Sequence, residues 1–267
     1  MQKRPQSHYQ YQRRSLENKV FKEVVINTST HLRSIHPGYG LRKLHYSLKQ
    51  LDIPIGRDRL RQLLKDKGLL FKPKPRYFVK TTQSRHQYRL YPNLVKGCVI
   101  DRPEQVWVAD ITAIKVNRRP YFLALVVDAY SRRIMGWELA DKNTGSLTCK
   151  ALLKALSQRK YPHQKIIHHS DRGTQYCCDQ YRMLLKEADF TVSTTESGNP
   201  RENAIAERTI KTLKYEYGLK EMFKNRKTVL RTIRDATFAY NYFRIHYSCE
   251  MLTPSTKHNS FTPPFFV

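Results

Sequence analysis

The spacing of apolar residues from Val106 onward first follows the two-residue period of strands and then alternates between the periods of helices and strands. Apolar residues alternate with polar residues from Val106 onward, a two-residue turn candidate follows at Asn117-Arg118, and a buried run begins at Tyr121. A third strand is expected at residues 133–139, after which helical and strand patterns take turns. The resulting order, βββαβαβα, predicts an α/β protein with a mixed five-stranded sheet.

This order of elements is typical of the RNase H-like fold, which we therefore expect over residues 104–222. The turn candidate also sets the register of the first two strands. It places Asp128 about 10 Å along the strand from the level of Asp110 and on the opposite face of the sheet. We expect Asp128 to have a structural role, with Arg132 or Arg133 as its partner.

The net charge indicates the kind of partner. Forty-nine Lys and Arg residues against 22 Asp and Glu give +27, and residues 1–100 alone hold 22 basic and five acidic side chains. Such a charge favours a polyanion, nucleic acid above all, because each cation that neutralises a phosphate releases a counterion. No apolar run is long enough for a membrane span, so we expect no membrane partner. Five cysteines without CxxC spacing also argue against a disulfide scaffold or a zinc ribbon.

The N-terminal 70 residues read as a small all-helical region. An amphipathic helix is predicted over residues 12–33, and two shorter helices flank a break at residues 52–56. This arrangement resembles a helix-turn-helix that binds DNA, with Arg57 and Arg61 as contacts. The alternative is a helical hairpin whose basic face is merely hydrated.

Residues 71–103 lack periodicity, are punctuated by prolines and hold eight basic residues against one acid. We expect an extended basic linker here that lies along the phosphate backbone. Alternatively, its aromatic residues pin it onto the next domain, and both roles are compatible. The expected DNA contacts of this linker are Lys72, Lys74 and Arg76. After the central core, residues 223–267 are expected to pack on it as a C-terminal helix and tail.

Three acids on separate elements form the candidate site. Asp110 lies inside a strand, in an apolar setting that requires a nearby cation, and Asp171 closes the fourth strand. Glu207 lies on a later helix. Three oxygen ligands without a His/Cys set suit Mg²⁺, or Mn²⁺ in its place, and two such ions support in-line phosphoryl displacement. Taken singly, each acid has a structural alternative, such as a pair between Glu207 and Lys211.

The helix that carries Glu207 has a well-marked start. Asn199 is the expected N-cap, with Pro200 and Glu202 at the first and third positions of a capping box. Lys211 and Lys214 follow Glu207 on the same side of the helix. The buried stripe is expected at Ala206, Ile210, Leu213 and Tyr217.

The spacing of the acids matches a known pattern. Sixty residues separate Asp110 from Asp171, and 35 separate Asp171 from Glu207, as in the D, D, 35, E pattern of retroviral integrases and transposases. The surrounding motifs resemble the second-frame product (OrfB) of insertion-sequence family three. The motifs that carry this resemblance are residues 37–42, 107–112, 127–137, 169–176, 203–207, 240–246 and 252–254.

The resemblance implies a DDE-type transposase that cuts a DNA strand and transfers the 3′-OH end to another strand. It implies that Asp110, Asp171 and Glu207 bind the metal ions. The residues expected to position DNA there are Lys214, Lys211 and Arg172, and those expected to support the acids are His169 and Asn203.

The expected partners are the double-stranded element ends and target, the first-frame OrfA protein or a frameshift fusion with it, and further copies of the chain on DNA. The expected location is the cytoplasm of a prokaryote, at the nucleoid during activity. Two rival functions stay open, namely a nuclease or resolvase of the same fold without strand transfer, and a non-catalytic DNA-binding regulator.

Overall fold

A computed structural model describes residues 5–71, 91–162, 164–196 and 200–262. The chain divides into two compact units, Met1–Pro75 and Arg76–Val267. The linker residues Lys72, Lys74 and Arg76 lie outside the described residues. Within the described ranges, no helix combines the length and the apolar character that crossing a membrane requires.

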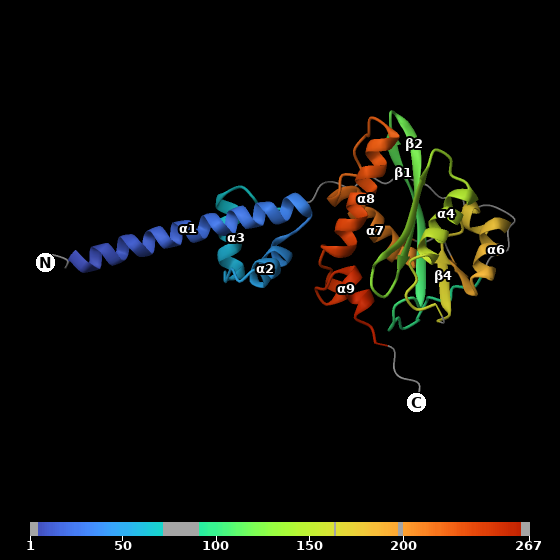
Figure 1. Cartoon of the computed structure of the whole chain (residues 1–267), viewed down its shortest axis with the longest axis horizontal. Helices are drawn as coiled ribbons and strands as arrows, with labels where there is room; N and C mark the ends of the chain where they lie inside the picture. Colours follow the sequence, from blue (N-terminus) through green and yellow to red (C-terminus); the bar gives the residue numbers. More distant parts are fainter. Residues whose placement is uncertain (1–4, 72–90, 163, 197–199, 263–267) are drawn as a thin grey trace. The chain divides into compact units, whose positions relative to one another are not determined.

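The first unit consists of three helices, α1 (Pro5–Ile35), α2 (Leu41–Gln50) and α3 (Arg57–Asp66). Leucines at helical spacing on α2 and α3 are buried, and so is Val25 of α1. Figure 1 shows that α1 extends well beyond the two short helices, so this helix is longer than the pattern predicted. Arg57 and Arg61 are exposed on α3, where they are accessible to a partner.

The second unit is built on the mixed five-stranded sheet that the pattern predicted, in the order β3-β2-β1-β4-β5. β1 is antiparallel to β2 and parallel to β4, while β3 and β5 form the two edges. The strands are β1 (Val106–Val116), β2 (Arg119–Asp128), β3 (Ile134–Ala140), β4 (Ile166–Ser170) and β5 (Phe190–Thr194). Asn117 and Arg118 form the predicted turn, with φ of 46° and 61°, and Asp110 is opposite Leu125 as expected.

Helices cover both faces of this sheet, as Figure 1 shows. Because alternate residues of a strand point to opposite faces, Trp107 and Ala109 of β1 pack toward α4 and α6, whereas Val106 and Val108 pack toward α7 and α8. Asp110 therefore belongs to the face covered by α7. The helices are α4 (Gly145–Leu156), α5 (Thr174–Cys177), α6 (Asp179–Glu187), α7 (Ala204–Glu216), α8 (Arg226–Tyr242) and α9 (Pro254–Asn259), with short 3₁₀ turns at Pro200–Asn203 and Tyr247–Cys249.

The start of α7 differs from the prediction. The α-helix begins at Ala204, after the 3₁₀ turn Pro200–Asn203, and its N-cap is Asn203. The expected N-cap, Asn199, lies outside the described residues. The carboxylate of Glu202 accepts a hydrogen bond from the backbone N–H of Glu196. The tighter turn leaves the Asn203 side chain available for a bond outside its own helix.

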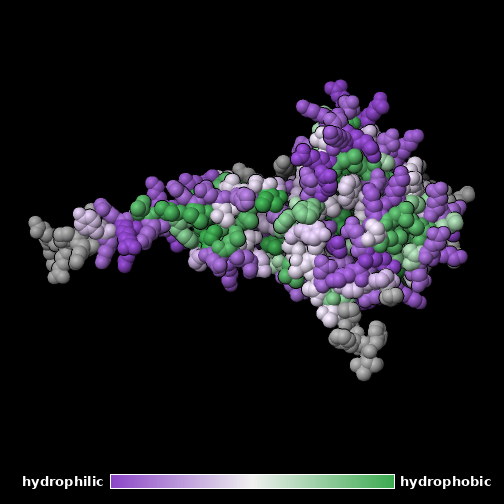
Figure 2. Space-filling view, in the orientation of Figure 1, coloured by the Kyte–Doolittle hydropathy of each residue, from purple (hydrophilic) through white to green (hydrophobic). Residues whose placement is uncertain are grey.

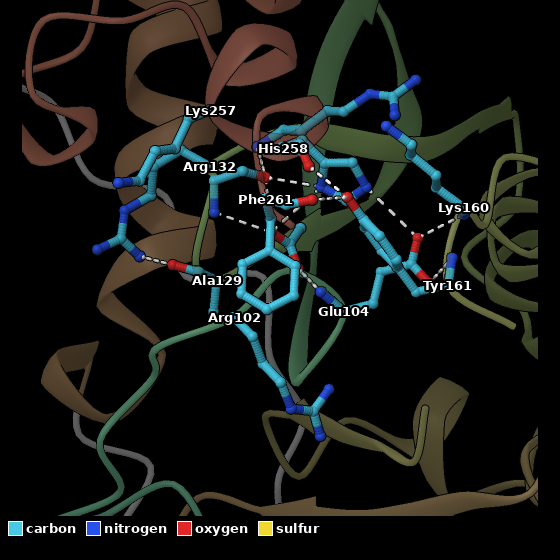
Figure 3. Close-up of polar contacts among 12 residues, drawn as sticks. Arg102, Glu104, Ala129, Arg132, Lys160, Tyr161, Lys257, His258 and Phe261 are labelled. Atoms are coloured by element: carbon cyan, nitrogen blue, oxygen red, sulfur yellow. Dashed lines mark hydrogen bonds and ion pairs between the residues drawn. The ribbon is translucent and has the colours of Figure 1, made fainter. Parts of the chain in front are cut away.

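A buried ionic network lies at the end of the sheet where β1 begins and β2 ends (Figure 3). Glu104 and Asp128 are both fully buried, and His258 of α9 lies between them. The His258 Nε2 atom is 3.4 Å from Glu104 Oε1, and Nδ1 is 3.5 Å from Asp128 Oδ2. Arg159 adds a second cation, with its Nε 3.4 Å from Glu104 Oε2. The C-terminal helix is thereby fixed to the core through paired charges.

The expected pairing of Asp128 with Arg132 or Arg133 is wrong. Asp128 accepts hydrogen bonds from the backbone N–H of Glu104 (2.8 Å) and from the N–H and hydroxyl of Ser131 (2.8 and 2.6 Å). These donors satisfy the carboxylate, and the half-buried side chains of Arg132 and Arg133 donate instead to Ser248 and Gln158. Its structural role, by contrast, agrees with the prediction, because Asp128 is remote from Asp110 along the strand.

Candidate active site

Asp110 and Asp171 come from neighbouring parallel strands. The β1–β4 register pairs Ala109 with Ser170, the last residue of β4. Continued by one residue, that register brings Asp110 beside Asp171, since adjacent strands are about 4.8 Å apart. The Asp171 carboxylate accepts a hydrogen bond from the backbone N–H of Gly173 (3.0 Å), which holds it at the strand end. A pair of carboxylates thus lies at the C-terminal end of β4.

Two polar residues fix the start of α7 against these strands. The Asn203 amide Nδ2 donates to the carbonyl of Ala109 (2.8 Å), the residue directly before Asp110. His169 of β4 contacts the Glu202 carbonyl through Nε2 (3.0 Å) and the Ser193 hydroxyl through Nδ1 (2.9 Å). Burial lowers the pKa of His169, so the imidazole is neutral. Both residues therefore support the segment that leads to Glu207.

Glu207 lies in the first turn of α7 and brings a third carboxylate to the pair. The pKa of Asp110 is raised to about 8 by burial, by the charge of Asp171 and by that of Glu207, against the hydrogen bond from the Ile111 N–H. Lys214 opposes this shift and supplies the positive charge that the setting of Asp110 requires. The three acids thus influence one another electrostatically, as groups that share a site do.

Two lysines of α7 place positive charge near these carboxylates. The Lys211 ammonium is 2.7 Å from Glu207 Oε2, so the pair anticipated as the structural alternative does form. Lys214 is half-buried, and burial lowers its pKa while the charge of Asp110 acts in the opposite sense. No three His, Cys, Asp or Glu side chains of the described ranges are gathered closely enough to hold a metal ion as they stand.

Arg172 follows Asp171 but points to a neighbouring loop. Its Nε donates to the carbonyl of Thr195 (2.7 Å), and another guanidinium nitrogen donates to the carbonyl of Glu196. In this structure the side chain therefore ties the loop after β5 to the end of β4.

Tyr176 is a neighbour of the acids that the sequence analysis did not single out. Burial raises the pKa of its hydroxyl, and the charges of Tyr181, Asp110 and Asp171 add to this shift. The hydroxyl is buried without a hydrogen-bond partner in the described part of the chain. Its position five residues after Asp171, on the short helix α5, is the signal that would have identified it.

The geometry, taken together, places Asp110 and Asp171 on adjacent parallel strands and Glu207 in the first turn of α7, where the charges of Asp171 and Glu207 act on Asp110. All candidate ligands are oxygens, which suits hard divalent cations better than zinc. Two lysines on one helix lie beside the acids, in position for an anionic substrate.

Known proteins are similar to this chain over the region that contains the three acids. Two models of an integrase core domain match residues 100–200 and 188–254. The chain is 36% identical over 219 residues to an uncharacterized 31 kDa protein of insertion element IS600 from Shigella sonnei, covering 81% of this chain and 80% of the relative. It is 31% identical over 223 residues to the transposase InsF of insertion sequence IS3A from Escherichia coli, covering 83% and 77%.

Among solved structures, the chain is similar to a simian T-cell lymphotropic virus intasome solved with a PP2A regulatory subunit. The TM-score is 0.51 at 18% identity, and the match covers 88% of this chain and 76% of that one. At this identity the likeness concerns the fold. It confirms the RNase H-like architecture that the order of elements predicted.

Proposed function

Since the chain belongs to the IS3 family of insertion-sequence transposases and contains an integrase core domain, we propose that Asp110, Asp171 and Glu207 carry out its DNA cleavage and strand transfer. The enzyme is a DDE-type polynucleotidyl transferase that acts in DNA integration and recombination. The observation that supports the assignment is the placement of three acids by separate elements, with Asp110 beside Asp171 in the β1–β4 register and Glu207 in the first turn of α7, where its charge acts on Asp110.

We further propose that these carboxylates hold Mg²⁺, or Mn²⁺ in its place, as two ions. The residues fit such a site because all their donors are oxygens and the cluster carries more negative charge than its surroundings tolerate. The unpartnered Tyr176 hydroxyl beside the acids also fits a polar occupant. When bound, divalent ions would activate the attacking oxygen and stabilise the leaving one.

The lysines and Arg172 would then act on the DNA. Once the carboxylates are neutralised, the ammonium groups of Lys211 and Lys214 become available for phosphate oxygens on the same face of α7. Arg172 would contribute its guanidinium charge at the end of β4, beside the loop that it holds. Asn203 and His169 keep Glu207 aligned with the strands.

The proposed partners are the duplex ends of the element and its target, further copies of the chain on DNA, and the first-frame OrfA protein or its fusion. In the N-terminal part, we propose that Arg57, Arg61, Lys72, Lys74 and Arg76 contact phosphates. We propose that the protein acts in the prokaryotic cytoplasm, at the nucleoid. The high positive charge of residues 1–100 supports the proposal of DNA binding.

Supplying pre-cut element ends with free 3′-OH groups tests the proposed strand transfer. We expect joined products with a target duplex in Mg²⁺, in the presence of the first-frame protein. A nuclease or resolvase would hydrolyse uncut ends but leave pre-cut ends unjoined, and a regulator would bind both without changing them. Either of those outcomes would reject the proposal.

Lys214→Ala should reduce joining about tenfold to a hundredfold, because a phosphate contact near the reacting group is lost. Its thermal stability should change little. The measurements are joining rate and melting temperature, with the exposed Lys186→Ala as the matched control. A large fall in melting temperature with joining intact would indicate that Lys214 serves only to neutralise Asp110.

Deleting residues 1–70 should weaken DNA affinity and flatten the dependence of log K on log salt, since 15 basic and five acidic residues, a net charge of +10 out of +27, are removed. The second unit should remain folded, because the compact unit Arg76–Val267 holds the entire sheet. Anisotropy titrations at several salt concentrations and circular dichroism check this. An unchanged slope would contradict the proposed role of the N-terminal region.

A further inference from the structure

The turn of the β1–β2 hairpin is joined to the segment between α7 and α8. The backbone N–H of Phe223 donates to the carbonyl of Lys115 (2.9 Å), and the N–H of Asn117 donates to the carbonyl of Phe223 (2.8 Å). The Phe223 side chain is buried in the core below. Two segments that are distant in sequence thus form one fixed surface, residues 117–119 with 220–227, which we name the hairpin-tip surface.

This surface is exposed and strongly basic. Figure 2 shows hydrophilic side chains crowded at the end of the unit where Figure 1 has the β1–β2 turn. Its exposed basic residues are Arg118, Arg119, Lys220, Lys224, Arg226 and Lys227. Glu221 is its one acid. Arg118 and Lys224 also line an open hollow of about 390 Å³. Like charges gathered in this way favour an anionic partner.

The charges of the hairpin-tip surface are available to such a partner. Within the described ranges, no ion pair engages the side chains of Arg118, Arg119, Lys224, Arg226 or Lys227. The salt bridges of α8 lie further along that helix, at Asp235.

Arg118 occupies a backbone conformation that costs energy. Its φ of 61° lies in the left-handed region, which disfavours residues with a side chain and is usually occupied by glycine in such a turn. A charged residue at this position places a guanidinium at the outermost point of the hairpin.

The hairpin-tip surface lies beyond the acids along two elements. β1 continues six residues from Asp110 to Val116, which is about 20 Å at the rise of a strand. α7 continues nine residues from Glu207 to Glu216, about 14 Å at the rise of a helix, and leads toward the segment that holds Phe223. The roughly 20 Å along β1 correspond to about six base pairs at about 3.4 Å per base pair.

We propose that the hairpin-tip surface binds the backbone of the duplex whose phosphate lies at the acids, about six base pairs away from that phosphate. This inference rests on the proposed function. It adds a second contact region on the catalytic unit, distinct from the lysines of α7 and from the N-terminal helices.

The test compares two triple variants of the full chain. Arg118→Gln/Arg119→Gln/Lys224→Gln removes three charges from the hairpin-tip surface. The control, Lys150→Gln/Lys165→Gln/Lys186→Gln, removes three exposed charges near α4, α6 and the start of β4. Binding of a labelled 30-base-pair duplex in Ca²⁺ is measured by anisotropy across a salt series.

We expect the first variant to lose about tenfold or more in affinity at 0.1 M salt and to lower the salt slope by about 2–3, because each lost phosphate contact accounts for about 0.9. The control should keep the wild-type slope. Equal slopes for wild type and the first variant, or an equal loss in the control, would overturn the inference.

Two further variants separate this inference from misfolding and from the proposed chemistry. Arg118→Gly relieves the backbone conformation, so it should melt no lower than wild type yet lower the slope by about 0.9. An unchanged slope in this variant would count against the inference. Asp110→Asn keeps the hairpin-tip surface, so its DNA binding should persist or tighten. If Asp110→Asn still joined ends, the proposed function would fail while the binding result stood.

Discussion

Asp110→Asn, Asp171→Asn and Glu207→Gln should each reduce Mg²⁺-dependent joining by on the order of a thousandfold or more. Each change would remove one proposed oxygen ligand of the metal ions from a site where the charges of Asp171 and Glu207 already act on Asp110. DNA binding should persist or tighten, because a negative charge near the phosphates is lost. Joining, binding and melting temperature are measured for all three variants in parallel.

Stability and metal identity distinguish catalysis from a structural role. If the acids served only as caps or pair partners, the variants would lose stability and joining would fall in proportion to folded protein. We expect melting temperatures equal to or above wild type without metal, since self-repulsion is reduced. Ca²⁺ should support DNA binding but little joining, because its distances to oxygen ligands are longer and its coordination geometry is less strict. Substantial Mg²⁺-dependent joining by any one variant would refute the assignment.

His258→Ala should lower the free energy of unfolding of the second unit by about 3–5 kcal/mol, because Glu104 and Asp128 remain buried without their shared cation. The expected fall in melting temperature is about 6–20 °C. Asn259→Ala, next to it on α9 but exposed, is the matched control and should melt near wild type. A His258→Ala melting temperature within 2 °C of wild type would show that the network contributes little.

The stability lost in His258→Ala should depend on pH in a defined direction. Burial lowers the pKa of His258, but its contacts with Asp128 and Glu104 raise it above 6.5 overall. The stabilisation is therefore complete below pH 6.5 and fades as the pH rises through the folded value. Burial raises the pKa of Glu104, yet the bonds from His258 and from the Lys160 and Tyr161 N–H groups bring it below 4.5, so its contribution fades in acid. The difference between wild type and His258→Ala should thus be largest between about pH 5 and 6.5.

Local sequence signals predicted the parts of the fold that depend on short-range patterns. The turn at Asn117-Arg118 fixed the register of β1 and β2, and hence the separation of Asp128 from Asp110. The position of Asp171 at the end of a strand predicted that it lies where open α/β sheets have their sites, and the register of β1 with β4 places it beside Asp110. Those two inferences need only the periods of strands and the geometry of a turn.

Long-range and ambiguous features escaped prediction. The 3₁₀ turn before α7 shares its Pro and Glu signals with a capping box, and only contacts to β1 and β4 distinguish the two. The pairing of Lys214 with Asp110 depends on how α7 packs across the sheet. No local pattern connects Glu104 with His258, because their contact forms only when the whole chain has folded.

That late contact has a consequence for the order in which the protein becomes complete during synthesis. Ser131 and His258, which share a hydrogen bond in the network, are 127 positions apart. A growing or truncated chain that ends before residue 258 already contains Asp110, Asp171 and Glu207, but it must bury Asp128 without its histidine. The sheet that presents the acids should therefore reach full stability only after α9 has been made, when translation has passed the core.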